Sequence, residues 1–111
     1  MLPHPIPIEL AEVIAQRLRV IGDPTRIRVL DALRQQELSV GQLAELVETS
    51  QQNASKHLGT LLQAGIVSRR KSGTTALYAI ADDSVFALCE QICGALQAQL
   101  AELSTLIGAE R

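Results

Sequence analysis

A stretch in the middle of the chain carries the side chains that could recognise a polyanion. Between Thr49 and Ala81 the sequence contains no Asp or Glu, yet it holds four basic residues, which are Lys56, Arg69, Arg70 and Lys71. The whole chain of 111 residues has 10 Lys and Arg, 12 Asp and Glu, and a net charge of -2. A basic segment in an acidic protein indicates one face that meets a polyanion, although four charges can also gather by chance.

Part of this segment is expected to form a helix from Ser50 to Ala64, with Ser50 as its cap. The residues away from its apolar side are Gln51, Gln52, Asn53, Ser55, Lys56, Gly59 and Gln63. Gln and Asn can pair with adenine through two hydrogen bonds, and Lys can bind phosphate or guanine. The alternative is an ordinary solvated helix face. His57 lies at the flank of the apolar side, which favours a packed histidine over a ligand.

The remaining cations of the segment lie beside an expected turn. Arg69, Arg70 and Lys71 come just before Ser72, Gly73 and Thr74. Three cations at a hairpin tip could straddle a phosphate backbone or enter a minor groove. A basic tip can also be a solubilising edge that discourages strand pairing.

Hydrophobic periodicity predicts the elements that position these side chains. We expect a mainly α fold with a small β-hairpin. The predicted helices are Ile8 to Ile21, a second after Asp23-Pro24, a short third capped by Ser39, the fourth from Ser50, and a last one from Asp83 to Ile107. The predicted strands are Ile66 to Arg70 and Thr75 to Ile80, joined through residues 71–74. The two short helices on either side of Glu48-Thr49-Ser50 indicate a helix-turn-helix.

The last predicted helix has a long apolar stripe, and at 1.5 Å per residue it is roughly 37 Å long. A body this small cannot cover such a stripe, so we expect a homodimer formed through the first and last helices. The predicted organisation is a flexible arm at 1–7, one domain at 8–107 and a tail at 108–111.

Several classes of protein are disfavoured. The chain offers no nucleophile with a base at usable spacing, no glycine-rich phosphate loop, and no carboxylate pair beyond Asp82-Asp83, so we do not expect an enzyme. No apolar run approaches the roughly 18 residues of a membrane span, and residues 1–7 do not look like a signal peptide. We therefore expect a cytoplasmic protein with no membrane partner.

Three longer motifs stand out in the sequence, DPTRIRVLDAL at 23–33, SQQNASKHL at 50–58 and LLQAGIVSRRKSG at 61–73. On these motifs the chain resembles the ArsR/SmtB family of winged-helix repressors. The resemblance implies a winged helix-turn-helix that binds operator DNA as a homodimer and releases it when an inducer binds. It places the DNA-binding residues on the fourth helix and the wing, namely Ser50, Gln51, Gln52, Asn53, Ser55, Lys56, Arg69, Arg70, Lys71 and Thr74.

The sequence departs from the family pattern at the turn and at the sensor. Glu48 stands where the family usually has glycine. The family's metal-sensing motif has cysteines where this chain has Ser39 and Gly41, and the last helix contains no histidine. We therefore expect no metal site and no cofactor.

The remaining sensor candidates are Cys89 and Cys93, at i and i+4 on the last helix. They could bind a soft ion or react with a thiol-reactive inducer, or they could simply pack as small apolar residues.

The leading hypothesis is a sequence-specific DNA-binding transcriptional regulator, a repressor released from double-stranded operator DNA by an inducer. The alternative is a winged-helix module that binds a protein partner and no specific DNA.

Overall fold

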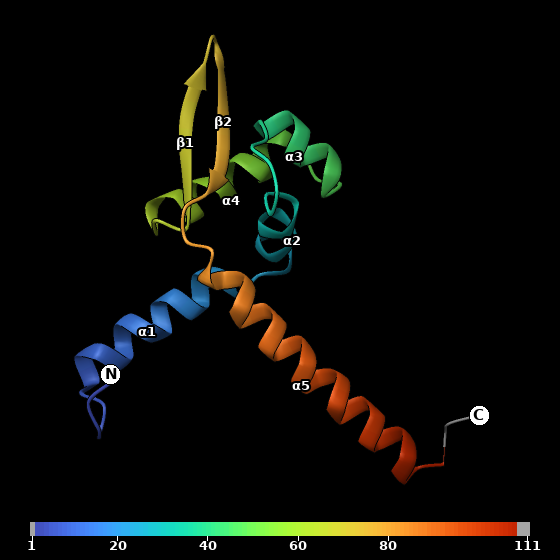
Figure 1. Ribbon diagram of the computed structural model, residues 1–111. Coiled ribbons are helices and arrows are strands. Elements are labelled where there is room, and N and C mark those ends of the chain that lie inside the picture. The colour runs from blue at the N-terminus through green and yellow to red at the C-terminus, as the bar shows by residue number, and fades with distance from the viewer. Residues whose placement is uncertain (1, 109–111) are drawn as a thin grey trace.

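The computed structural model describes residues 2–108. It contains five helices and a two-stranded antiparallel hairpin (Figure 1). The elements in chain order are α1 (Ile8–Ile21), α2 (Pro24–Ala32), α3 (Val40–Leu46), α4 (Gln51–Gln63), β1 (Val67–Ser72), β2 (Thr75–Ile80) and α5 (Ser84–Leu106). The predicted mainly α fold with a small hairpin is confirmed. Met1 of the predicted arm and residues 109–111 of the predicted tail lie outside the described residues.

The core lies where α2, α3, α4 and the base of the hairpin meet. Its fully buried side chains come from each of these elements and include Val29, Leu43, Leu58, Leu61 and Ile66. On α4 the residues Ala54, Leu58 and Leu61 have no exposed surface. Burial of this stripe fixes the rotation of α4 about its own axis, so the opposite polar side faces outward.

The predicted helix caps are confirmed at three places. The Asp23 side chain accepts a hydrogen bond from the Arg26 backbone N–H at 3.1 Å. Ser39 forms a capping box with Gln42, and the Ser50 hydroxyl accepts from the Asn53 backbone N–H at 3.0 Å. Each side chain satisfies a backbone donor that its helix leaves free.

The hairpin is longer than the sequence indicated. The predicted first strand ended at Arg70, but β1 continues to Ser72, which pairs with Thr75. The connection is therefore only Gly73 and Thr74, and Gly73 has a φ of +64°. A positive φ at the first residue of a two-residue turn matches the twist of the paired strands, which allows the ladder to run to the tip.

α1 and α5 diverge from the body like two arms (Figure 1). Only Val85 of α5 is buried, and only Val20 and Ile21 of α1. Large apolar side chains stay exposed along both arms: Ile8, Val13, Leu18, Ile92, Leu96, Leu100 and Leu103. Across residues 2–108, no helix has the length and apolarity needed to cross a bilayer.

α5 begins at Ser84, and its first turn is capped by the Asp82 side chain and not by the residue at the N-cap position. Asp83 occupies the N-cap position but makes no side-chain capping bond. The Asp82 carboxylate instead accepts from the backbone N–H of Ser84 at 3.0 Å and from its hydroxyl at 2.6 Å.

The turn between α3 and α4 contains a left-handed residue. Glu48 has a φ of +57°, and it is the only non-glycine residue with a positive φ in the described part of the chain. This is the position at which the family resemblance implies glycine. The turn therefore keeps the geometry that glycine favours, at a steric cost for the Glu48 Cβ.

We expect Glu48→Gly to raise the free energy of unfolding by roughly 0.5 to 1 kcal/mol, because relief of the left-handed strain outweighs the added freedom of the unfolded chain. The Glu48 carboxylate lies 3.9 Å from Arg28 and is largely exposed, so its loss costs little. Urea unfolding at one fixed subunit concentration measures the change. Glu48→Ala keeps the Cβ and should give no gain; an equal gain in both variants contradicts the strain argument.

Candidate nucleic-acid interface

The outward side of α4 presents a row of short polar side chains and one cation. Gln52, Ser55 and Lys56 are exposed and share one helix face through spacings of three and four residues. Together with Ser50 and Asn53, Gln52 and Lys56 line a shallow hollow on the surface. The face offers hydrogen-bond donors and acceptors, and no carboxylate stands on α4 to repel phosphate.

Two other predicted residues of α4 are partly occupied by contacts within the protein. The Asn53 side-chain amide donates to the Thr49 hydroxyl at 2.9 Å and is half-buried. The Gln51 amide lies over the start of α3, where a Cβ added to Gly41 would stand 3.4 Å from its nitrogen. Gln52, Ser55 and Lys56 are exposed side chains of this face that point away from α3, whereas Gln51 is exposed but lies beside α3.

The three cations of the hairpin do not share one side. In the strand ladder Arg69 stands opposite Tyr78, and Lys71 stands opposite Ala76. Because successive side chains of a strand point to opposite faces, Arg69 and Lys71 project from one face of the hairpin and Arg70 from the other. Thr74 is exposed in the turn at the tip. The sequence-based expectation that the tip gathers Arg69, Arg70 and Lys71 in one place is therefore not met, because side chains alternate along a strand.

Arg70 is held by a carboxylate that is distant in sequence. Its Nε and Nη2 donate to the two Glu37 oxygens, both at 2.6 Å. Hydrogen bonding to Arg70 lowers the pKa of Glu37, and the same contact raises the pKa of Arg70. Leu38, next to Glu37, pairs with Tyr78 along β2, which brings the carboxylate beside the hairpin.

The acidic residues that border the acid-free segment are also paired. Glu48 lies 3.9 Å from Arg28, and Asp82 lies 2.6 Å from Arg17. In contrast, Lys56, Arg69 and Lys71 make no ion pair with any residue in 2–108. The charges that remain uncompensated on this surface are positive.

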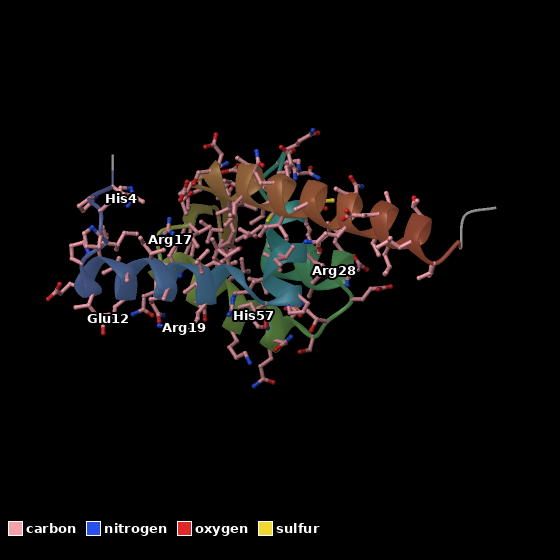
Figure 2. All side chains as sticks on the ribbon, turned by 90° about the horizontal axis from the view of Figure 1, so that it is seen from below. His4, Glu12, Arg17, Arg19, Arg28 and His57 are labelled. Atoms are coloured by element: carbon pink, nitrogen blue, oxygen red, sulfur yellow. The ribbon has the colours of Figure 1, made fainter. Side chains whose placement is uncertain are left out.

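A cluster of His57, Asp23 and Arg26 contacts the side of α4 that faces the protein body. The His57 side chain is 9% exposed, its Nε2 lies 4.0 Å from Asp23, and its Nδ1 lies 3.0 Å from Arg26 Nη1. Because guanidinium can only donate, Nδ1 accepts and the neutral ring carries its proton on Nε2. Arg26 also donates to the backbone carbonyls of Val20 and Arg19, so the cluster joins the end of α1 to the middle of α4, near His57 in Figure 2. The expected packed histidine is confirmed.

The two cysteines of α5 lie in different surroundings. Cys89 is half-buried and lines a cavity of about 420 Å³ between α2, α3 and α5, whereas Cys93 is exposed. In the described range, no three His, Cys, Asp or Glu side chains gather in a way that could hold a metal ion. The sensor hypothesis for Cys89 and Cys93 stays a prediction.

Comparison with known proteins places the chain among DNA-binding regulators. Residues 21–70 match the model of a helix-turn-helix domain. The transcriptional regulator KmtR of Mycobacterium tuberculosis is 35% identical over 83 residues, which cover 75% of this chain and 64% of KmtR. The chain thus spans a little less than two thirds of that relative.

Solved structures share both fold and sequence with the chain. The crystal structure of NolR from Sinorhizobium fredii is 37% identical, with a TM-score of 0.71, and the match covers 88% of this chain and 95% of NolR. A solution structure from Mycobacterium bovis is 26% identical, with a TM-score of 0.72 and coverage of 86% and 88%. It is a homodimeric winged helix-turn-helix DNA-binding domain, described as a possible ArsR-family transcriptional regulator.

The buried His57 predicts a pH dependence of stability. Burial lowers its pKa, the charges of Arg26 and Lys56 lower it further, and Asp23 opposes them. Since the unfolded chain then binds a proton more readily than the folded one, stability is lost as the pH falls below about 6.5. Between pH 7.5 and pH 5.5 this loss is at most about 1.4 kcal/mol.

Urea unfolding at the two pH values measures this loss in the wild type and in His57→Asn. The asparagine oxygen can still accept from Arg26 but does not titrate. We expect the variant to lose less stability than the wild type on acidification. The same loss in both proteins would mean that His57 does not contribute.

Proposed function

The chain belongs to the ArsR/SmtB family of winged helix-turn-helix transcriptional regulators, and on this basis we propose that it is a homodimeric repressor of double-stranded operator DNA. In this proposal α4 is the recognition helix, which enters the major groove, and the β1–β2 hairpin is the wing, which follows the flanking backbone. Release by an inducer belongs to the proposal as well, and its chemistry stays open between the thiols of α5 and another site.

One observation supports this proposal most strongly. The exposed row of Gln52, Ser55 and Lys56 lies on an acid-free segment that also contains Arg69 and Lys71, which form no ion pair within residues 2–108. Amides can discriminate between base edges, whereas the cations supply affinity for phosphate that does not depend on sequence. The free backbone N–H groups at the start of α4 can also donate to a phosphate. The first turn of α4 contains no acidic residue that would repel it.

The proposed homodimer follows from the surface of the two arms. Seven large apolar side chains on α1 and α5 are between 49% and 66% exposed in the single chain. An apolar surface this extended indicates a protein interface. A two-fold axis through the arms would present two recognition helices to successive turns of one duplex.

Binding selection from a random-sequence duplex library tests the DNA-binding proposal against the alternative of a protein-interaction module. We expect the wild type to enrich a two-fold symmetric sequence. Gln52→Ala should change the preferred bases, with a loss of discrimination of about 1 to 3 kcal/mol at the affected position.

Lys56→Ala is the matched control on the same face, and it should weaken binding to selected and random duplexes alike. A wild-type protein that enriches no sequence would favour the protein-interaction module.

The wing predicts a specific salt dependence. If Arg69 and Lys71 each neutralise a phosphate, the double variant Arg69→Ala/Lys71→Ala should flatten the slope of log K against log salt by about 1.8 per wing. Affinity should fall on every duplex, because phosphate contacts carry no sequence information. Titrations between 50 and 200 mM salt, about the range over which phosphate contacts lose affinity, measure the slope.

Glu37 provides the complementary test. Because its carboxylate occupies Arg70, Glu37→Gln should release a third wing cation, raise affinity and steepen the slope by up to about 0.9 per wing. Arg70→Ala alone should change the slope less than Arg69→Ala. An unchanged slope in Glu37→Gln would place Arg70 outside the interface.

A further inference from the structure

The side chain of Arg17 connects three elements that are far apart in sequence. Arg17 lies on α1, its Nη1 donates to the Ala64 carbonyl at the end of α4, and its Nη2 donates to Asp82 Oδ2 at 2.6 Å, just before α5. In Figure 2, Arg17 lies on the side of α1 that faces α5, whereas Arg19 lies on the opposite side. One guanidinium therefore joins the recognition helix to both arms.

We propose that Arg17 is a positioning residue, which fixes the recognition helix against the two arms and so determines the spacing of DNA half-sites that the dimer accepts. The proposal rests on the proposed function. In it, Arg17 acts through the Ala64 carbonyl and Asp82 and does not bind DNA itself.

The contact with Ala64 is favourable because of where α4 ends. The last carbonyls of a helix have no partner within it, and the helix dipole favours a positive charge there. α4 has no basic residue in its own last turn. The backbone N–H groups of Gly65 and Ile66 bond to the carbonyls of Leu62 and Leu61, and the Ala64 carbonyl accepts from Arg17.

The contact with Asp82 carries the connection to α5. One carboxylate oxygen accepts from Arg17, and the other accepts from the backbone N–H and hydroxyl of Ser84 in the first turn of α5. The hydrogen bonds from Ser84 and from Arg17 lower the pKa of Asp82, so the group stays charged at neutral pH. Asp82 thus links the arginine to the root of the last helix.

Other contacts hold each arm separately: Arg26 joins the end of α1 to α4, and Arg34 contacts Phe86 and Glu90 of α5. The Arg17 bridge differs from these contacts because it links α4 to both arms at once. In α5 only Val85 is buried, and in α1 only Val20 and Ile21. Apolar packing is non-directional and tolerates small rotations, whereas two charge-assisted hydrogen bonds from one planar group define an angle. A change of one base pair in spacing rotates a half-site by about 34°, so even a modest change of angle alters which spacing fits.

The experiment uses the sequence obtained by selection and places its two half-sites at spacings from two base pairs shorter to two longer. Arg17→Met removes both donors while it keeps the methylene chain. Asp82→Asn breaks the same bridge from the other end. Its amide oxygen can still accept from Ser84, but its NH2 group then faces Arg17 and cannot accept a hydrogen bond. Arg19→Met is the matched control, since the Arg19 side chain bonds only to Gln16 of its own helix in the described structure.

For Arg17→Met and for Asp82→Asn we expect about tenfold weaker binding to DNA with the preferred half-site spacing. The loss of affinity should be smaller on DNA whose spacing is one or two base pairs shorter or longer, so that the spacing preference flattens. The double variant should be no worse than Arg17→Met. The salt slope should stay that of the wild type, and Arg19→Met should keep the wild-type profile. Arg17→Lys, which retains the charge and can reach one partner, should recover part of the preference.

Three results would overturn the positioning role. They are a wild-type spacing profile in the bridge variants, an equal loss of affinity at every spacing, and a salt slope reduced by about 0.9 per subunit, as for a direct phosphate contact. If Arg17→Met does not fold, Asp82→Asn and Arg17→Lys decide the question. A wild-type protein that selects no sequence would instead reject the proposed function, and the positioning role with it.

Discussion

The last carbonyl groups of an α-helix lack partners within the helix, and in this protein arginines from other elements supply the missing donors. Arg17, Arg26 and Arg28 donate to carbonyls at the ends of α4, α1 and α3. Neither α3 nor α4 has a basic residue in its own last turn. Because these arginines come from α1 and α2, the first two helices of the chain hold the helix-turn-helix in place.

This arrangement divides the cations of the protein into two groups. Arg17, Arg26 and Arg28 donate to carbonyl groups at helix ends, so their charge is compensated within the fold. Lys56, Arg69 and Lys71 carry unpaired charge outward from a segment that lacks acids, as seen over residues 2–108. A net charge of -2 therefore coexists with a positive surface, because the acids that border this surface are paired.

Local patterns were sufficient to predict most of the fold. The caps at Asp23, Ser39 and Ser50 depend on residues three positions away, and the buried stripe of α4 repeats every three to four residues, so the sequence alone reveals both. The predicted end of the first strand at Arg70 was wrong, because the ladder runs on to a two-residue turn that depends on the positive φ of Gly73. The arginine bridges escaped prediction because their partners lie far along the chain, as with Arg17 and Asp82. For the same reason, nothing in the sequence indicated that Glu37 would hold Arg70.

The exposed leucines of α5 also affect how the protein responds to its own abundance. Beyond Cys89 almost every residue of the helix is exposed in the single chain, and most of the stability of a protein helix comes from packing of its apolar face. In the proposed homodimer, folding of the distal part of α5 and association of two subunits therefore form a single equilibrium that depends on subunit concentration. At low expression the amount of dimer would then rise with the square of the number of chains, so that the response to gene dosage is steeper than linear without any added ligand.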